Sequence, residues 1–282
     1  MTVFRAACVQ VTAGAEVAAN LEAAGALVRA ARKAGAEFVA LPENVALMAA
    51  RSAEVHAEAQ PESAHPAPGY FRALARETGV WLLAGSIGVA ADGKVANRSL
   101  LLDPGGVIVG RYDKIHMFDV DLPSGQSYRE SESFAPGGAA VLCELPWGPI
   151  GLSVCYDLRF PGLYRTLAQA GARFLAIPSA FTRETGRAHW HVLVRARAIE
   201  NGCFVFAPCQ WGSHPGQRTT YGHSLIVSPW GEVLADGGED TGFIMADIDT
   251  ALVDEARAAI PSLTHDRAFA PPVQRRRDPD AA

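Results

Sequence analysis

The sequence predicts an α/β fold in which two layers of sheet are flanked by helices, and three observations support this prediction. About eleven short apolar segments are bounded by Gly, Pro or Asp, as β-strands commonly are. Helical patterns separate several of these segments, whereas the middle and the end of the chain run from strand to strand. Hydrophobic residues make up 49% of the chain, which is enough for the core of one large domain over residues 1–282.

The predicted helices share one pattern of apolar residues. In the first, apolar residues recur at spacings of four and three from Val17 to Ala31, and Gly35 follows as a C-cap. The same pattern predicts four further helices, of which the first three are each closed by a glycine, over residues 70–78, 162–170, 188–201 and 249–259. Each helix is expected to pack one face on a sheet.

Two segments that join strands directly are predicted to be β-hairpins. The turn is Pro-Gly-Gly within residues 97–114 and Pro-Trp-Gly within residues 225–238. We expect the folded core to run from about residue 3 to about residue 260, and the charged residues from about 261 to 282, with their prolines, to form a tail.

The composition excludes several classes of protein. The net charge is only -5, and the single dense run of cations, Arg275 to Arg277, is followed by Asp278 and Asp280, so no nucleic acid is expected as a partner. No uncharged apolar run approaches the roughly 18 residues that a membrane-spanning helix needs. The first residues lack the features of a signal peptide, and the chain is therefore expected to be cytoplasmic.

The cysteines give the first indication of chemistry. There are five, an odd number without CxxC spacing, so neither a disulfide framework nor a metal site is predicted. Cys155 differs from Cys8, Cys143 and Cys203, which read as buried core cysteines, because it ends an apolar strand and precedes the polar turn YDLRFPG. The carboxyl ends of strands commonly hold the sites of α/β folds, and the N–H groups and the arginine of such a turn can stabilise a thiolate or an oxyanion.

Two charged residues also follow predicted strands. Glu43 closes the segment EFVALPE. Lys114 directly follows the predicted strand VIVGRYD, in the segment YDKIHMFD. Taken singly, Glu43 reads as a solvated loop glutamate or a helix N-terminal cap, and Lys114 reads as a surface lysine. Together with Cys155, however, they supply a base, a cation for an oxyanion and a nucleophile, which are the groups that amide hydrolysis through an acyl-enzyme needs.

Three segments that carry these residues resemble the signature segments of the nitrilase superfamily of carbon–nitrogen hydrolases, in the same order. They are LPEN, YDKIHMFD and GLSVCYDLRFP, which contain Glu43, Lys114 and Cys155. The resemblance implies a four-layer α-β-β-α sandwich. It also implies that subunits pair through their helices, as a homodimer or a higher even homo-oligomer.

The resemblance further implies a mechanism. Cys155 attacks the substrate carbonyl, Glu43 accepts the thiol proton, and Lys114 with the Tyr156 backbone N–H holds the oxyanion. No metal or organic cofactor enters this scheme. Glu130 matches a second glutamate that the family often keeps near the lysine, although it also reads as a solvated charge in a polar loop.

The substrate is expected to be a small-molecule amide. Residues 179–212 resemble the branch that holds deaminated glutathione amidase and ω-amidase, and more closely the first, which releases 2-oxoglutarate and cysteinylglycine. Because that substrate has two carboxylates, the arginines and the histidine of neighbouring segments are predicted to border the pocket: Arg159, Arg183, Arg187 and His189. Arg187 stands where the family more often has a proline.

Other functions stay open on the sequence alone. The same chemistry fits ω-amidase acting on 2-oxoglutaramate, an N-carbamoyl amino acid hydrolase or a general short-amide amidase. A catalytically silent member that acts as a binding protein is a further alternative.

Overall fold

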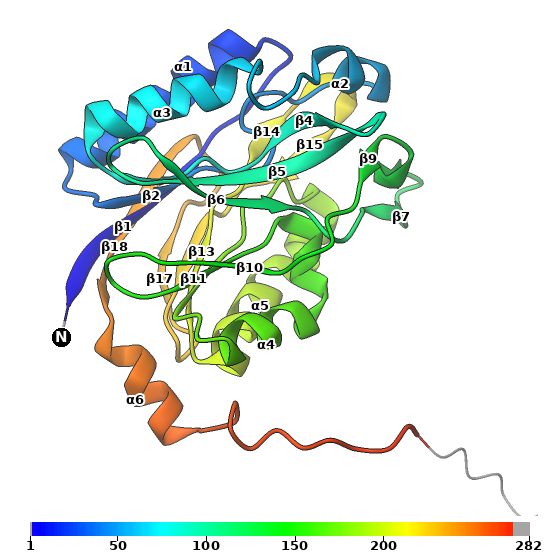
Figure 1. The fold of residues 1–282 in the computed structure, drawn as a ribbon. Coiled ribbons are helices and arrows are strands. Elements are labelled where there is room, and N and C mark those ends of the chain that lie inside the picture. The colour runs from blue at the N-terminus through cyan, green and yellow to red at the C-terminus, as the bar shows by residue number, and fades with distance from the viewer. Residues whose placement is uncertain (1, 273–282) are drawn as a thin grey trace, which may run out of the picture.

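The computed structural model describes residues 2–272, and two β-sheets packed face to face form its centre (Figure 1). The first sheet has eight strands, β1 (Val3–Gln10), β2 (Phe38–Ala40), β3 (Trp81–Leu83), β4 (Ile87–Ala91), β5 (Lys94–Leu102), β6 (Ile108–Asp113), β9 (Phe134–Ala135) and β18 (Gly242–Asp249). The second has six, β10 (Val141–Cys143), β11 (Ile150–Leu152), β12 (Phe174–Ala176), β13 (Phe204–Ala207), β16 (Leu225–Val227) and β17 (Val233–Asp236).

Two small hairpins and six α-helices complete the described elements. The hairpins pair β7 (Asp119–Asp121) with β8 (Ser127–Arg129) and β14 (Trp211–Ser213) with β15 (Thr219–Tyr221). The helices are α1 (Val17–Lys33), α2 (Ser52–Glu58), α3 (Pro66–Thr78), α4 (Pro161–Gln169), α5 (Arg183–Asn201) and α6 (Ala251–Ala259). Short 3-10 turns span Glu130–Glu132, Cys155–Arg159 and Pro215–Gln217.

The helices cover the outer faces of the two sheets. In Figure 1, α1 and α3 lie on the first sheet and α4 and α5 on the second. Helical crossovers join parallel neighbours, β1 to β2 through α1 and β11 to β12 and on to β13 through α4 and α5. The predicted four-layer α-β-β-α sandwich is therefore confirmed.

Alternation along the strands of the first sheet produces two core layers. On β1, Phe4 and Cys8 face the core between the sheets, whereas Ala7 and Val9 face the core under α1 and α3. Since successive side chains of a strand point to opposite faces, a strand buried on both sides reads as a continuous apolar run. This explains why residues 6–9 of β1 are all apolar.

Both predicted hairpins are present, and the predicted glycines adopt left-handed backbone at the helix ends. Strands β5 and β6 pair antiparallel, as do β16 and β17, and Gly79 and Gly202 end their helices at φ 68° and 55°.

The starts of two helices were predicted too late. Helix α3 begins at Pro66 rather than at residue 70, because proline is well suited to the first helical position and the His65 ring caps the Ala67 N–H. Helix α5 begins at Arg183 rather than at 188, with Thr182 as its N-cap. The short helix α2 was not predicted at all.

The chain beyond α6 continues over α4. Arg165 of α4 donates to the Ser262 carbonyl at 2.6 Å and pairs with Asp266 at 3.1 Å, so the beginning of the predicted tail is bound to the core. The rest of that prediction, residues 273–282, lies outside the described residues. Within residues 2–272, no helix is long and apolar enough to cross a membrane.

Candidate active site

Three strand ends, from both sheets, bring together the residues for which the sequence predicts chemistry. Glu43 follows β2, Lys114 follows β6 and Cys155 follows β11. Lys114 Nζ lies 3.1 Å from Glu43 Oε1, and the Cys155 thiol is hydrogen-bonded to the Glu43 carboxylate. All three side chains are almost fully buried. A carboxylate, an ammonium and a thiol therefore share one small volume.

The Glu43 carboxylate is held from both sides. Its Oε1 also accepts a hydrogen bond from Asn97 Nδ2 at 2.9 Å, and its Oε2 accepts one from the Ala180 N–H at 2.9 Å. Gln210 Nε2 donates to the Glu43 backbone carbonyl at 3.0 Å. These contacts fix the carboxylate in one orientation, as a positioned base requires.

Lys114 lies between two carboxylates. Its Nζ is 2.9 and 2.8 Å from the two oxygens of Glu130, and the Phe118 N–H donates to Glu130 Oε2 at 2.6 Å. Glu130 therefore lies next to Lys114, as the family resemblance implied. Because the side chain of Lys114 is only 2% exposed, its charge depends on these anionic partners.

The charges of the site act on one another. Burial raises the pKa of Glu43, but the Lys114 and Arg218 charges and the hydrogen bonds from Cys155 and Lys114 outweigh it and hold that pKa below its ordinary value. Burial lowers the pKa of Lys114, but Glu130 and Glu43 raise it more strongly, to above its ordinary value. The resting site therefore contains a carboxylate and an ammonium.

The thiol is protonated at rest. Burial and the charge of Glu43 raise the pKa of Cys155 well above its ordinary value, and Lys114 opposes this only in part. Cys155 is thus not a standing thiolate, and it needs a base within reach in order to attack.

The turn that carries Cys155 has a special backbone. Cys155 adopts φ 50°, and its N–H donates to the Pro178 carbonyl at 2.9 Å. A left-handed conformation is uncommon for a residue with a Cβ and recurs where side chains are held for a function. Tyr156 comes next and lines the cavity described below, but the role of its N–H at an oxyanion stays a prediction.

Asp157 holds this turn against the segment of Lys114. Its fully buried carboxylate accepts hydrogen bonds from the Tyr112 hydroxyl at 2.7 Å, the Val154 N–H at 2.9 Å and the His116 N–H at 3.0 Å. The Nδ1 of the His116 ring lies 2.7 Å away. One carboxylate thus connects residues two positions before and after Lys114 with residues next to Cys155.

A cavity of about 430 Å³ opens over these groups. Glu43, Lys114, Glu130 and Cys155 line it, together with the rings of Phe118, Tyr128, Phe134, Tyr156 and Phe181 and the arginines 51, 129 and 218. A volume of this size and a mixture of rings with a few charged groups are typical of a small-molecule site.

Arg218 has the least complete set of partners among these arginines. Arg51 pairs with Glu54, and Arg129 pairs with Asp121. Arg218 donates to the Ala180 carbonyl at 3.0 Å and lies over the Tyr128 ring at 5.7 Å. Its buried Nε has no hydrogen-bond partner among the described residues.

The structure does not bring the four residues predicted to bind substrate to the wall of this cavity. Because α5 begins at Arg183, Arg183 and Arg187 are helical residues four positions apart and point outward, and Arg183 stacks over Trp211 at 4.9 Å. His189 is also exposed. Arg159 packs over Phe181 at 5.2 Å, with its Nη1 3.3 Å from His189 Nδ1.

Arg159 remains the nearest of the four to the chemistry. Phe181, on which it packs, lines the cavity, and the Arg159 charge interacts with the Cys155 thiol. Its contact with substrate stays a prediction.

Asn97, Asp157 and Arg218 were not predicted as site residues. For Asp157 the sequence held a signal. Tyr112 and His116 stand two positions before and after Lys114 in an extended segment, so their side chains share the face of Lys114, and both residues donate to Asp157. Asn97 and Arg218 carry no comparable pattern.

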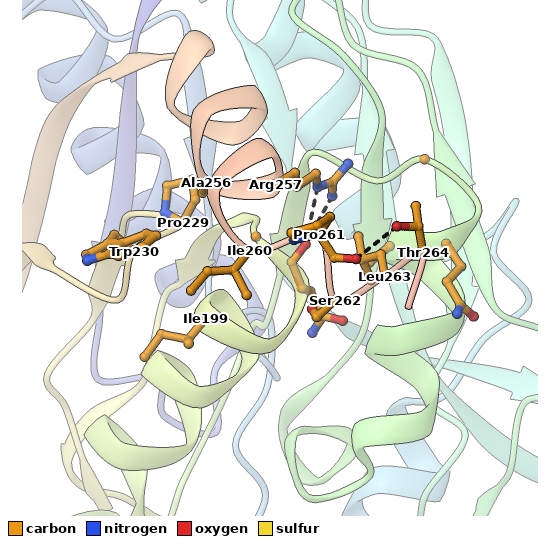
Figure 2. Close-up of a pocket in the computed structure, with 15 residues that line it drawn as sticks. Ile199, Pro229, Trp230, Ala256, Arg257, Ile260, Pro261, Ser262, Leu263 and Thr264 are labelled. Carbon is orange, nitrogen blue, oxygen red and sulfur yellow. Dashed lines mark hydrogen bonds between the residues drawn. The ribbon is translucent and has the colours of Figure 1, made fainter. Parts of the chain in front are cut away.

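A second cavity, of about 680 Å³, lies between α4, α5 and α6 (Figure 2). Ile199, Trp230 and Ile260 surround it, and Arg257 crosses it to the Asn201 carbonyl. Although it is larger, none of the predicted catalytic residues lines it. The smaller cavity is therefore the candidate active site.

Comparisons with known proteins agree with this assignment. The family model described as "Carbon-nitrogen hydrolase" matches residues 5–258. A protein of Synechocystis sp. named "Deaminated glutathione amidase" is 40% identical over 270 residues, 94% of this chain and 98% of that protein. A human protein with the same name is 40% identical over 264 residues, 92% of this chain and 80% of that protein.

Solved structures give the same result. The C. elegans NitFhit protein superposes with a TM-score of 0.85 at 36% identity, over 94% of this chain and 65% of that chain. Nit3 of Saccharomyces cerevisiae, described as a member of branch 10 of the nitrilase superfamily, superposes with a TM-score of 0.83 at 28% identity, over 92% and 94%.

Proposed function

The chain belongs to the carbon–nitrogen hydrolase family, and we propose that this amidase hydrolyses deaminated glutathione to 2-oxoglutarate and cysteinylglycine. The observation that carries the choice of substrate is the name shared by relatives that are 40% identical over almost the whole chain. The buried carboxylate, ammonium and thiol around the cavity support the reaction type.

In the proposed reaction the Cys155 sulfur bonds to the carbonyl carbon of the amide while its proton passes to Glu43. Lys114 and the Tyr156 N–H hold the oxyanion. When the oxyanion collapses, the C–N bond breaks, Glu43 returns the proton to the leaving amine, and cysteinylglycine departs. Water then attacks the thioester with Glu43 as base, and the carboxylate of 2-oxoglutarate and the free thiol are formed.

The charges of the resting site suit this sequence. Glu43 is ionised and hydrogen-bonded to a protonated thiol, so the base and the proton that it must accept are already in contact. Glu130 keeps Lys114 in place and charged, and is proposed as a positioning residue. The roles of Glu43 and Glu130 thus rest on contacts with Cys155 and Lys114 that are already formed in this structure.

Arg218 is proposed to bind a substrate carboxylate. It lines the same cavity as Cys155, and its Nε has a donor to offer. Deaminated glutathione carries a carboxylate at each end, and an arginine pairs with such a group through two parallel hydrogen bonds. The unpaired donor is the kind of feature that a carboxylate would satisfy.

A product assay by mass spectrometry tests the proposal. The purified protein and its Cys155→Ala variant are incubated with deaminated glutathione and with 2-oxoglutaramate at equal concentrations. We expect faster release of cysteinylglycine than of ammonia, and neither product from the variant. Preference for 2-oxoglutaramate would identify an ω-amidase, and turnover by Cys155→Ala would refute the nucleophile.

Association into a homodimer or a higher even oligomer is also proposed. Apolar side chains are exposed around α5 and α6, at 68% for Val192, 62% for Trp230 and 59% for Ile260, and the last two lie at the second cavity (Figure 2). A cluster of this kind commonly marks an interface. Light scattering of the protein and of Trp230→Glu tests this, since a monomeric wild-type protein would refute it. A cytoplasmic location stays a prediction.

A further inference from the structure

A second cluster of titratable side chains surrounds Asp236, the last residue of β17. His191 Nε2 lies 3.0 Å from Asp236 Oδ2, and His223 Nδ1 lies 2.9 Å from Oδ1 and 3.2 Å from Oδ2. The potential ligand atoms, one from each residue, all lie within 4.8 Å of one another. None of the three residues lines the catalytic cavity. We propose that His191, His223 and Asp236 bind a divalent transition-metal ion of the zinc class.

The separations fit such an ion. Zinc binds imidazole nitrogen at roughly 2.0–2.1 Å and carboxylate oxygen at a similar distance, so two ligands of a tetrahedral ion stand about 3.3 Å apart. The distances from Asp236 Oδ2 to the two nitrogens, 3.0 and 3.2 Å, are close to this value. An ion among the three atoms would replace the contacts between the carboxylate and the rings, and water would complete its coordination.

The ligands are held by groups of a second layer. Trp190, which is buried beside His191, donates from Nε1 to the His223 carbonyl at 2.7 Å. The His223 backbone has φ 52°, and its ring stacks on Tyr221 at 4.5 Å. The Gly238 N–H donates to Asp236 Oδ1 at 2.9 Å. Support of this kind orients metal ligands and raises affinity.

The chemistry of the donors limits the choice of ion. Two imidazoles with one carboxylate suit zinc and its neighbours, whereas calcium and magnesium prefer oxygen ligands alone. The side chains are partly exposed, at 34%, 21% and 35% for His191, His223 and Asp236, so an ion can reach them.

A bound ion would connect three separate parts of the chain. His191 lies on α5, His223 precedes β16, and Asp236 ends β17, which is an edge strand of the second sheet. Because the site is built only in the folded chain, the ion would stabilise the fold. The geometry points to a structural clamp rather than to a part of the amidase reaction.

The test measures binding of Zn²⁺ alone to the full chain in a Cys155→Ala background, so that the catalytic thiol cannot act as a ligand. Competition with a chromophoric chelator gives stoichiometry and affinity, and Co²⁺ in place of Zn²⁺ reports a tetrahedral site by its visible absorption. We expect one equivalent to bind at micromolar concentrations and to raise the Tm.

Matched variants locate the ion. His191→Gln and His223→Asn each remove one ligand, and asparagine tolerates the left-handed backbone at position 223. Each is expected to weaken binding by at least about tenfold. The exposed His265→Gln is the control and is expected to bind like the parent. No binding at micromolar Zn²⁺, or equal binding by all variants, would overturn the proposal and leave a His–Asp–His hydrogen-bonded cluster. Neither result depends on the substrate.

Discussion

Replacing Asp157 by Asn is expected to damage both stability and turnover, although the residue is not expected to touch the substrate. The two oxygens of Asp157 receive hydrogen bonds in pairs, one pair from Tyr112 and Val154 and the other from the two nitrogens of His116. An asparagine can present an oxygen to only one pair.

The magnitude follows from the pair that loses its acceptor. A tyrosine hydroxyl or a histidine ring can turn from donor to acceptor, but the backbone N–H of Val154 or of His116 cannot. In either orientation of the amide, one buried N–H is left without a partner and charge-assisted bonds are weakened. We therefore expect a loss of about 2–4 kcal/mol in the free energy of unfolding.

Activity should fall further than unfolding explains. Asp157 connects the Cys155 turn with the Lys114 segment. Weaker hydrogen bonds to residue 157 would therefore let the nucleophile and the cation move relative to each other. A displacement of about 1 Å can cost about 100-fold in rate, and we expect a decrease of that order in kcat/KM, mainly in kcat.

The assay combines urea denaturation followed by circular dichroism, the product assay and the rate of Cys155 alkylation by iodoacetamide under conditions where the variant is folded. Asp113→Asn is the matched control, because Asp113 also lies beside Tyr112 but pairs with Arg98 near the surface. That change should cost less than about 1 kcal/mol. If Asp157→Asn stays within twofold of the wild type in kcat and unfolds at the same urea concentration, then the Asp157 carboxylate does not hold the Cys155 turn against the Lys114 segment as argued.

Three further outcomes are expected. Glu130→Gln should stay folded and lose most of kcat, and normal turnover in that variant would remove Glu130 from the site. Because the pKa of Glu43 is lowered, activity should persist above its ordinary value of 4.5 and be lost only as the pH falls below it. An acid limb of kcat/KM near neutral pH would contradict this lowered pKa. Glu43→Gln should also change the rate at which Cys155 is alkylated, and an unchanged rate would contradict the role of Glu43 as the base for the thiol. Arg218→Gln should raise KM for deaminated glutathione by at least roughly tenfold, since the loss of even one charged hydrogen bond corresponds to that factor, whereas an unchanged KM would exclude the proposed carboxylate contact.

Much of the fold follows from local patterns. Strands β2 and β3 were predictable because they are apolar on both faces, and the hairpins because Pro-Gly-Gly and Pro-Trp-Gly turns lie between apolar segments, whereas β9 of the first sheet was not predicted. The starts of α3 and α5 were missed because the first turn of α3, PAPG, contains two prolines and a glycine and the first turn of α5, RETG, is polar, so neither continues the apolar period of its helix. Those starts depend on Pro66 and Thr182, whose effects are local and do not appear in the periodicity.

From the residues alone the site was predictable only where a residue ends a strand, whereas Glu130 was predicted from the family resemblance. Glu43, Lys114 and Cys155 stand at such ends, and the packing of the two sheets brings the ends together. Asn97 lies inside β5 and reads as an ordinary strand residue, yet it donates to Glu43 across 54 positions of sequence. Arg218 comes from the loop between β14 and β15, the small hairpin that lies outside both large sheets. Contacts of this kind depend on the three-dimensional arrangement of the chain, and no regular spacing in the sequence indicates them.

Two carboxylates around one lysine have a reason in the proposed chemistry. When the Cys155 proton moves to Glu43, that carboxyl becomes neutral and a negative charge appears on the oxyanion instead. With Glu43 as its only partner, Lys114 would then depend on the substrate alone for a counter-charge in a buried setting. Glu130, at 2.8 Å, takes no part in this proton transfer and keeps the ammonium paired and aimed. The total charge of the site is therefore constant while the negative charge moves from base to oxyanion, and the cation that both approach does not have to move.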